Sequence, residues 1–343
     1  MGMSDENPEI SVEVFGEGPM PPTRSIWLRH IALLAVTVMT STMAGVLYPF
    51  GILPIETGPD PQTFGEAMAM LANLPLSYAA MLAGTVYLLF SDIDVLAYGL
   101  SFSLSLIFIL LSHEMGHYIA CRIYRVDATL PFFIPTPPLI GPAGTFGAFI
   151  KIRSPFPSRK SIFDIGVAGP IAGFIALLPI AVIGLITMKQ VPTDFVPEPG
   201  SLVFADPLLM KLIAFTFGID LNLGFRNPFY FAAWVGLLVT ALNLIPSGQL
   251  DGGHALFAVF GERIHFWSGR LAFVLMAALS VLGFWIYNSP SGFLIAILLG
   301  VMMRFRHPHP LVDLPLDGKR KAVALITFII FILSFSPFPI QII

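Results

Sequence analysis

Long apolar runs, separated by short polar or Pro/Gly-rich stretches, dominate the chain. They cover residues 26–50, 74–90, 95–118, 162–187, 229–245, 271–287, 293–303 and 322–335. A helix needs about 20 mostly apolar residues to cross the hydrocarbon core of a bilayer. Run 74–90 is borderline in length, and the last two runs are short. The pattern predicts an all-α polytopic membrane protein with six to eight transmembrane helices.

One segment departs from this pattern. Residues 131–157 are rich in Pro and Gly and cannot form a regular helix. Within them, residues 145–153 alternate enough to predict a short strand. Irregular backbone at membrane depth must be buried in protein or line a wet cavity. We therefore expect a re-entrant, partly strand-like loop here.

The composition agrees with a membrane protein. Hydrophobic residues make up 56% of the chain and charged residues 11%, whereas soluble domains carry roughly a quarter charged residues. The net charge of −3 argues against a nucleic-acid partner, which would need a basic patch. A single cysteine, Cys121, excludes an internal disulfide framework.

The distribution of charge predicts a topology. Basic residues gather in 122–160 and 304–321, and the loop 188–228 is acidic. By the positive-inside rule, the two basic stretches face the cytoplasm and the acidic loop faces the other side. The N-terminal third does not fit this scheme if runs 26–50, 74–90 and 95–118 all cross. We therefore expect 74–90 to be interfacial or re-entrant.

The first 23 residues are polar and acidic. They fit neither a secretory signal nor a transit peptide, and Glu6 breaks the myristoylation pattern. Such a composition predicts a disordered tail.

The run 95–118 ends in His113-Glu114-Met115-Gly116-His117. Three ionisable groups within five residues are costly in hydrocarbon, so a functional role is expected. Residues four apart share a helix face, and both imidazoles can therefore reach one zinc ion. The glutamate between them can hold and deprotonate a water molecule.

A catalytic zinc site usually has three protein ligands and one open position. A second polar cluster, residues 243–254, follows the apolar run that begins at 229. Pro246 and Gly248 predict a broken helix there, and Gly252-Gly253 a further turn of the backbone. Such a break can present Asp251 to a cation. The alternative for Asp251 is a helix cap or turn, because Asp-Gly is a turn signal.

Four motifs together resemble the site-2 protease family of intramembrane zinc metalloproteases: HEMGH, GTFGAFIKIRSP, AGPIAG and NLIPSGQLDGGH. The stretch 104–254 resembles the EGY-like subgroup, which lacks a PDZ domain. The resemblance implies one zinc per chain held by His113, His117 and Asp251, with Glu114 as catalytic base and Asn243 as an oxyanion donor. It also implies that 145–153 guides a transmembrane protein substrate.

Other residues have competing interpretations. Asn243 could instead form an interhelical hydrogen bond, and His254 is better explained by packing than by ligation. Cys121 also suits packing, because His113 and Cys121 are separated by about 12 Å of helix. His307 and His309 are expected in a polar loop facing water. The small-residue motif Gly169–Gly173 predicts close contact between helices.

Two further functions compete with a zinc intramembrane endopeptidase. An ion or metal transporter could use the same polar residues, but paired broken segments typical of transporters are not evident. A non-catalytic scaffold would not need Glu114.

We expect a tail at 1–25, N-terminal membrane segments at 26–92, a catalytic core at 93–262 and C-terminal helices at 263–343. The expected setting is a prokaryotic cytoplasmic membrane, with the active site nearer the cytoplasmic side. The sequence leaves the substrate and oligomeric state open.

Overall fold

The computed structural model describes residues 22–53, 61–190, 200–304 and 307–342. Most of the predicted N-terminal tail lies outside these residues. The helices are α1 (Arg24–Val46), α2 (Phe64–Ser91), α3 (Ile93–Ile123), α4 (Arg159–Ile186), α5 (Leu208–Phe217), α6 (Pro228–Leu244), α7 (Asp251–Phe260), α8 (Glu262–Tyr287), α9 (Ser291–Met302) and α10 (Gly318–Ser334). The prediction of an all-α fold is confirmed.

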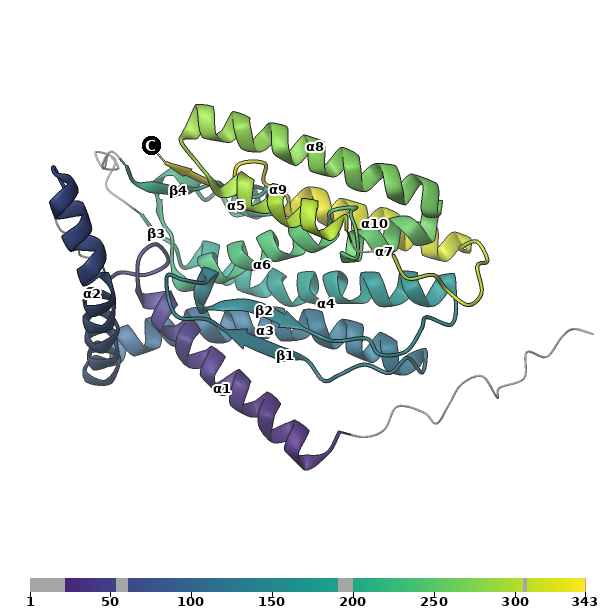
Figure 1. Cartoon of the computed structure of the whole chain (residues 1–343), viewed down its shortest axis with the longest axis horizontal. Coiled ribbons are helices and arrows are strands. Elements are labelled where there is room, and N and C mark those ends of the chain that lie inside the picture. The colour runs from purple at the N-terminus through teal and green to yellow at the C-terminus, as the bar shows by residue number, and fades with distance from the viewer. Residues whose placement is uncertain (1–21, 54–60, 191–199, 305–306, 343) are drawn as a thin grey trace, which may run out of the picture.

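Six short strands form three antiparallel pairs in the described part of the chain (Figure 1). The pairs are β1 (Phe132–Pro135) with β2 (Thr145–Phe149), β3 (Lys189–Gln190) with β5 (Gly224–Phe225), and β4 (Leu202–Phe204) with β6 (Ile340–Ile342). The strand predicted at 145–153 is therefore present as β2, but it ends at Phe149.

Five helices in the described residues are long and apolar enough to cross a membrane: α1, α2, α3, α4 and α8. The number is lower than the six to eight predicted because α6, α9 and α10 contain 17, 12 and 17 residues. Helix α6 is capped by Asn227 at its start and ends before Pro246. It is nevertheless deeply buried. Protein therefore surrounds this apolar run, which is too short to cross a bilayer on its own.

Helix α2 is longer than the run 74–90 that predicts it. A capping box between Thr63 and Glu66 starts the helix ten residues earlier, and it continues through Pro75. Its 28 residues suit a membrane crossing, which differs from the expected interfacial segment. The helix stands apart from the bundle in Figure 1. Its Tyr78 hydroxyl donates a hydrogen bond to the Pro138 carbonyl oxygen at 2.7 Å, in the turn between β1 and β2.

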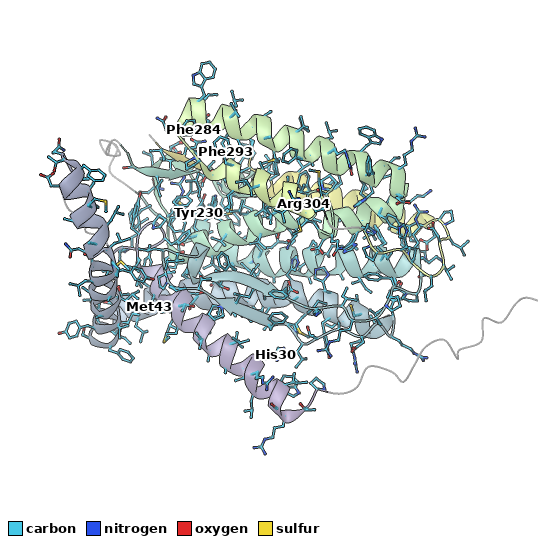
Figure 2. All side chains as sticks on the ribbon, in the orientation of Figure 1. His30, Met43, Tyr230, Phe284, Phe293 and Arg304 are labelled. Carbon is cyan, nitrogen blue, oxygen red and sulfur yellow. The ribbon has the colours of Figure 1, made fainter. Side chains whose placement is uncertain are left out.

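Helix α3 is the centre of the packing and contacts α1, α4 and α6. Its Phe102 and Leu106 side chains are fully buried, as are Leu177 on α4 and Tyr230 on α6. Figure 2 shows Tyr230 within the packed interior, whereas Phe284 on α8 lies near its outer surface. Phe284 is 52% exposed. Apolar groups thus fill both the core and the outer surface, as expected for a protein solvated by lipid.

Candidate metal centre

The motif His113–His117 lies in the last third of α3, where the sequence predicts it. Its side chains face inward: His113 is 4% exposed, Glu114 7% and His117 7%. The helix continues to Ile123 without a break. The one-turn spacing therefore places both imidazoles on the same side, facing α4 and α7.

Asp251 is the first residue of α7. Helix α6 stops at Leu244, and Gly248 adopts a left-handed conformation (φ +56°) in the connection. The expected second turn at Gly252-Gly253 is wrong, because both residues are helical. Their lack of a side chain serves close packing instead. A Cβ at Gly252 would lie 2.0 Å from the Leu244 carbonyl oxygen.

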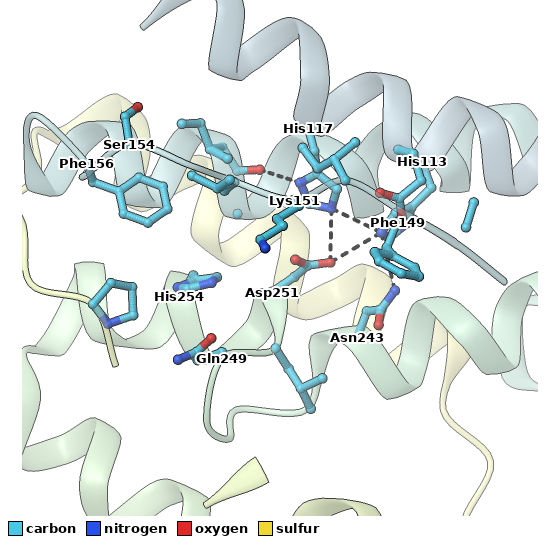
Figure 3. Close-up of a pocket in the computed structure, with 18 of the residues that line it drawn as sticks. His113, His117, Phe149, Lys151, Ser154, Phe156, Asn243, Gln249, Asp251 and His254 are labelled. Atoms are coloured by element: carbon cyan, nitrogen blue, oxygen red, sulfur yellow. Dashed lines mark hydrogen bonds and ion pairs between the residues drawn. The ribbon is translucent and has the colours of Figure 1, made fainter. Parts of the chain in front are cut away.

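The structure brings His113, His117 and Asp251 together (Figure 3). Asp251 Oδ2 lies 3.3 Å from Nε2 of each histidine, and the two Nε2 atoms are 3.1 Å apart. In a tetrahedral zinc site with metal–ligand bonds of 2.0–2.1 Å, ligand atoms are about 3.3–3.4 Å apart. The triangle of donor atoms therefore fits one zinc ion, and its chemistry, two imidazoles and a carboxylate, is a common zinc ligand set.

Helix α4 fixes the tautomer of His117. The Nδ1 atom donates a hydrogen bond to the Ile165 carbonyl oxygen at 2.7 Å, since a carbonyl oxygen can only accept. In the neutral ring, Nε2 then carries a lone pair directed toward Asp251 Oδ2. Two such acceptors repel unless a cation lies between them, and a second hydrogen bond of this kind is typical of metal-bound histidines.

Small residues on α3 and α4 create the space for these rings. A Cβ at Gly169 would lie 2.1 Å from His117 Nε2, and one at Gly173 would lie 3.1 Å from His113 Cβ. On α3, a Cβ at Gly116 would lie 2.4 Å from the Ala168 carbonyl oxygen. The predicted close contact at Gly169–Gly173 is confirmed, and its partner is the metal-binding pair itself.

Glu114 lies beside the donor triangle in a cavity of about 550 Å³. Ile150, just after β2, lines the same cavity. The β2 loop therefore forms one wall of the cavity that holds the buried carboxylate. The opposite wall comes from α7 and the connection before it.

Asn243, near the end of α6, faces the same centre. Its Nδ2 atom lies 3.3 Å from His113 Nε2. The amide is within reach of a group bound at the centre, and the same contact also links α6 to α3. Both interpretations from the sequence are compatible with this position.

The remaining candidates lie elsewhere or have structural partners. Cys121 is completely buried in the hydrophobic cluster between α3, α4 and α7. His309 is exposed, as expected, but the expectation for His307 is wrong. His307 is buried and its ring stacks on Phe257, while Nδ1 of His254 donates to its Nε2 at 2.9 Å. Nothing in the repeated His-Pro sequence distinguishes the buried histidine from the exposed one.

Two features of the site could not be recognised from the pattern of candidate metal ligands in the sequence. The Ile165 carbonyl acts through the backbone, so its side-chain type carries no information. Lys151 and Gln249 line the cavity through the local path of the chain. The alternation in 145–153 indicates a strand but does not show which side chains face the metal centre.

Comparisons with known proteins place these features in a family. The model of peptidase family M50 matches residues 101–283. A protein of Oryza sativa subsp. japonica named probable zinc metalloprotease EGY1, chloroplastic, is 32% identical over 279 residues, which are 77% of this chain and 43% of that protein. The Arabidopsis thaliana protein of the same name is 35% identical over 186 residues, 51% of this chain and 32% of that protein.

The chain spans less than half the length of these curated relatives. No solved structure matches. The relatives are named as chloroplastic plant proteins, so they do not support the expected prokaryotic membrane. They do confirm the resemblance to the EGY-like subgroup, which the motifs around His113 and Asp251 carry. The chain belongs to peptidase family M50.

Proposed function

We propose that this protein is a zinc-dependent intramembrane endopeptidase that cleaves a transmembrane segment of another membrane protein. The observation that carries this proposal is the triangle of His113, His117 and Asp251 donor atoms beside the buried Glu114, on a helix long enough to cross a membrane. The names of the plant relatives, probable zinc metalloproteases, support it. The proposed catalytic core is residues 93–262, and Pro308 adds to its cavity wall.

His113, His117 and Asp251 would hold one zinc ion per chain. Zinc supplies two effects when bound: it lowers the pKa of a water molecule and polarises the carbonyl group under attack. The hydrogen bond from His117 Nδ1 to Ile165 keeps the ring in the tautomer that binds metal. The site is closed by protein on the sides of α3, α4 and α7 and open to the cavity, where the substrate would enter.

Glu114 is the proposed general base. Its carboxylate takes a proton from the attacking water and then gives that proton to the nitrogen of the leaving amine. The carboxylate is buried and lines the cavity that the substrate would enter. Because Ile150 and Lys151 after β2 line the same cavity, a substrate that contacts this loop would also lie beside the base.

Asn243 is a proposed oxyanion donor. Its Nδ2 lies 3.3 Å from His113 Nε2, so a substrate carbonyl oxygen at the metal would be close to the amide. Donors fixed before the reaction stabilise the negative charge that develops in the transition state. A purely structural role would lower the stability of the protein rather than kcat when Asn243 is replaced by Ala.

The substrate helix must unwind before a peptide bond can be hydrolysed. β1 occupies one edge of β2 in the described two-stranded sheet, and Ala148 and Phe149 of β2 line the cavity together with residues 150–152. An unwound segment could pair with this edge and regain hydrogen bonds lost on unwinding. The polar backbone would then remain satisfied within the membrane.

The protein is an integral membrane protein. The proposed active site is nearer the side that carries the basic stretches 122–160 and 304–321, by the positive-inside rule.

The runner-up function, ion or metal transport, would use the same polar residues. It is favoured less because the plant relatives are named probable zinc metalloproteases.

Replacement of Glu114 by Gln tests the function. We expect loss of cleavage of a co-reconstituted transmembrane substrate, with bound zinc retained near one ion per chain. Glu262→Gln is the matched control because Glu262 is exposed and outside the metal-site cavity. Persistent cleavage by Glu114→Gln would refute the proposed base. The result that would favour transport is ion flux into liposomes that contain the wild-type protein, its loss with Asp251→Ala, and no proteolysis by either protein.

A further inference from the structure

Lys151 is the one lysine or arginine among the described residues that line the metal-site cavity. Its backbone is fixed by two hydrogen bonds to Thr129: its N–H donates to Thr129 Oγ1 at 2.9 Å, and its carbonyl oxygen accepts from the Thr129 N–H at 3.0 Å. Figure 3 shows the side chain extending from the loop into the cavity, toward Asp251 and His254. The ammonium group is therefore delivered to the cavity by an anchored backbone.

The ammonium of Lys151 has no carboxylate partner in the described part of the protein. Two residues later, Arg153 does have one, since its Nη1 lies 3.9 Å from Asp127 Oδ2. Arg153 does not line the cavity. The two basic side chains of the same loop thus differ: one is paired at the surface, and the other faces the site without an anion.

The charges around the cavity leave Lys151 unbalanced. Two carboxylates line it, Glu114 and Asp251. A bound divalent cation has a charge of +2, which these two carboxylates cancel. The charge of Lys151, whose side chain is exposed, is then left without a counter-charge among the residues that line the cavity. An incoming anionic group would restore neutrality.

Neighbouring groups in the cavity are polar but not anionic. His254 donates from Nδ1 to His307 Nε2, and His307 in turn donates from Nδ1 to the Pro308 carbonyl oxygen at 2.8 Å. This chain of hydrogen bonds holds both rings in defined neutral tautomers. Ser154 Oγ accepts from the Asp127 N–H at 2.8 Å, so its hydroxyl hydrogen remains available to donate. Neither histidine therefore carries a charge that could replace an anion beside Lys151.

We propose that Lys151 binds the carboxylate of a substrate side chain, so that the preferred substrate is a transmembrane segment with Asp or Glu close to the scissile bond. This inference rests on the proposed function and adds a substrate class to it. The lysine contributes to specificity and takes no part in the chemical step. Substrates without an acidic residue are expected to be cleaved by the same machinery, but more slowly.

Charge-reversal substitutions in the enzyme and in the substrate test whether Lys151 binds an acidic substrate side chain. The probes are Leu/Ala-based transmembrane peptides with a central Gly-Pro pair and a single Asp, Asn or Lys, placed in turn at each of the three residues on either side of the pair. Wild type, Lys151→Met, Lys151→Glu and the control Arg153→Glu are reconstituted in lipid nanodiscs. Cleavage gives kcat/KM for each peptide, and binding is measured separately in the Glu114→Gln background.

At one or more positions, wild type should prefer Asp over Asn by roughly two- to fivefold in both kcat/KM and affinity, as expected for an exposed charge pair. Lys151→Met should remove the preference, Lys151→Glu should shift it to the Lys peptide, and Arg153→Glu should keep the wild-type order. Equal handling of Asp and Asn at every position, or an unchanged preference in Lys151→Met, would overturn the inference. If wild type cleaves none of the peptides, the proposed function is in question, while binding to the Glu114→Gln forms still decides the role of Lys151.

Discussion

His117 Nδ1 lies 2.7 Å from the carbonyl oxygen of Ile165, so a backbone group of α4 sets the tautomer of a side chain on α3. The contact is buried and connects two helices that are about fifty residues apart in sequence. It shows that the metal centre depends on the packing of α3 against α4 as much as on the ligand residues. Predictions about the site therefore concern both helices.

Replacement of Gly169 by Ala should disable the metal centre without touching a ligand. The added Cβ would lie 2.1 Å from His117 Nε2, so the ring must leave its position or the helices must separate. We expect loss of bound zinc and of cleavage, and a decrease in stability of about 1–3 kcal/mol from overpacking. Metal analysis and thermal unfolding in detergent measure both effects. Gly84→Ala on α2 is the control, because nothing would lie within 4 Å of its added Cβ; equal zinc content in both variants would contradict this prediction.

Asp251→Ala should weaken zinc binding while leaving the fold intact. The carboxylate supplies one of three donor atoms, and the remaining two histidines form an incomplete site. We expect zinc affinity to fall by at least about 100-fold, more than is typical when only a supporting hydrogen bond is lost. Competition with a fluorescent chelator measures the affinity. Asp313→Ala removes an exposed carboxylate that pairs with Arg159 and should bind zinc as wild type does. Retention of full affinity by Asp251→Ala would exclude this residue as a ligand.

His307 should make the protein sensitive to acid. Burial, reinforced by the neighbouring His254 and His265, lowers the pKa of His307 to about 3, whereas an unfolded histidine titrates near 6.5. Between about pH 6.5 and pH 3 the unfolded chain binds a proton at this residue and the folded protein does not. The free energy of unfolding is therefore highest above about pH 6.5 and decreases as the pH falls toward 3. His307→Gln should show a smaller decrease in Tm between pH 7 and pH 5 than wild type does.

The control for this pH effect is His309→Gln. His309 is 64% exposed in its side chain and faces Glu262 at 3.9 Å, so its replacement should leave the acid-induced decrease in Tm close to that of wild type. The same decrease in all three proteins would show that other titrating groups cause the acid sensitivity.

Arg320→Met should loosen α10 from the core. The guanidinium donates to both carboxylate oxygens of Asp164 on α4 and to the Tyr124 hydroxyl at the end of α3, with distances of 2.5–3.1 Å. Removal of the cation leaves the half-buried Asp164 without its charged partner, and we expect a loss of about 1–3 kcal/mol. Thermal unfolding measures it, with exposed Lys321→Met as the control. If Asp164→Asn has the same effect alone and in combination with Arg320→Met, the two residues act as one unit.

The spacing of polar residues within apolar runs was enough to predict the chemistry of this protein. Residues four apart on a helix must share a face, so His113 and His117 could be paired from the sequence. A charged residue in a broken apolar helix is costly without a partner, and this cost pointed to Asp251. The same reasoning predicted an all-α membrane fold, because only helices can satisfy the backbone of such runs in lipid.

The sequence could not predict how far each helix extends or which polar residues become buried. Helix α6 keeps nearly the bounds of the run 229–245, but a capping box begins α2 ten residues before the run 74–90, a local effect that hydropathy does not record. His307 and His309 share the same sequence context, yet His307 is buried and stacks on Phe257, whereas His309 is exposed and meets the same ring edge-on.

What the sequence by itself determined is the set of groups that can bind a metal and activate water, since this follows from residue type and helical period. Only the tertiary structure decided that Asp251 comes within 3.3 Å of both histidines, that Glu114 and Ile150 line one cavity, and that Lys151 enters this cavity. The physical reason is that these contacts join α3, α7 and the β2 loop, whose relative positions depend on glycine-mediated packing between helices distant in sequence.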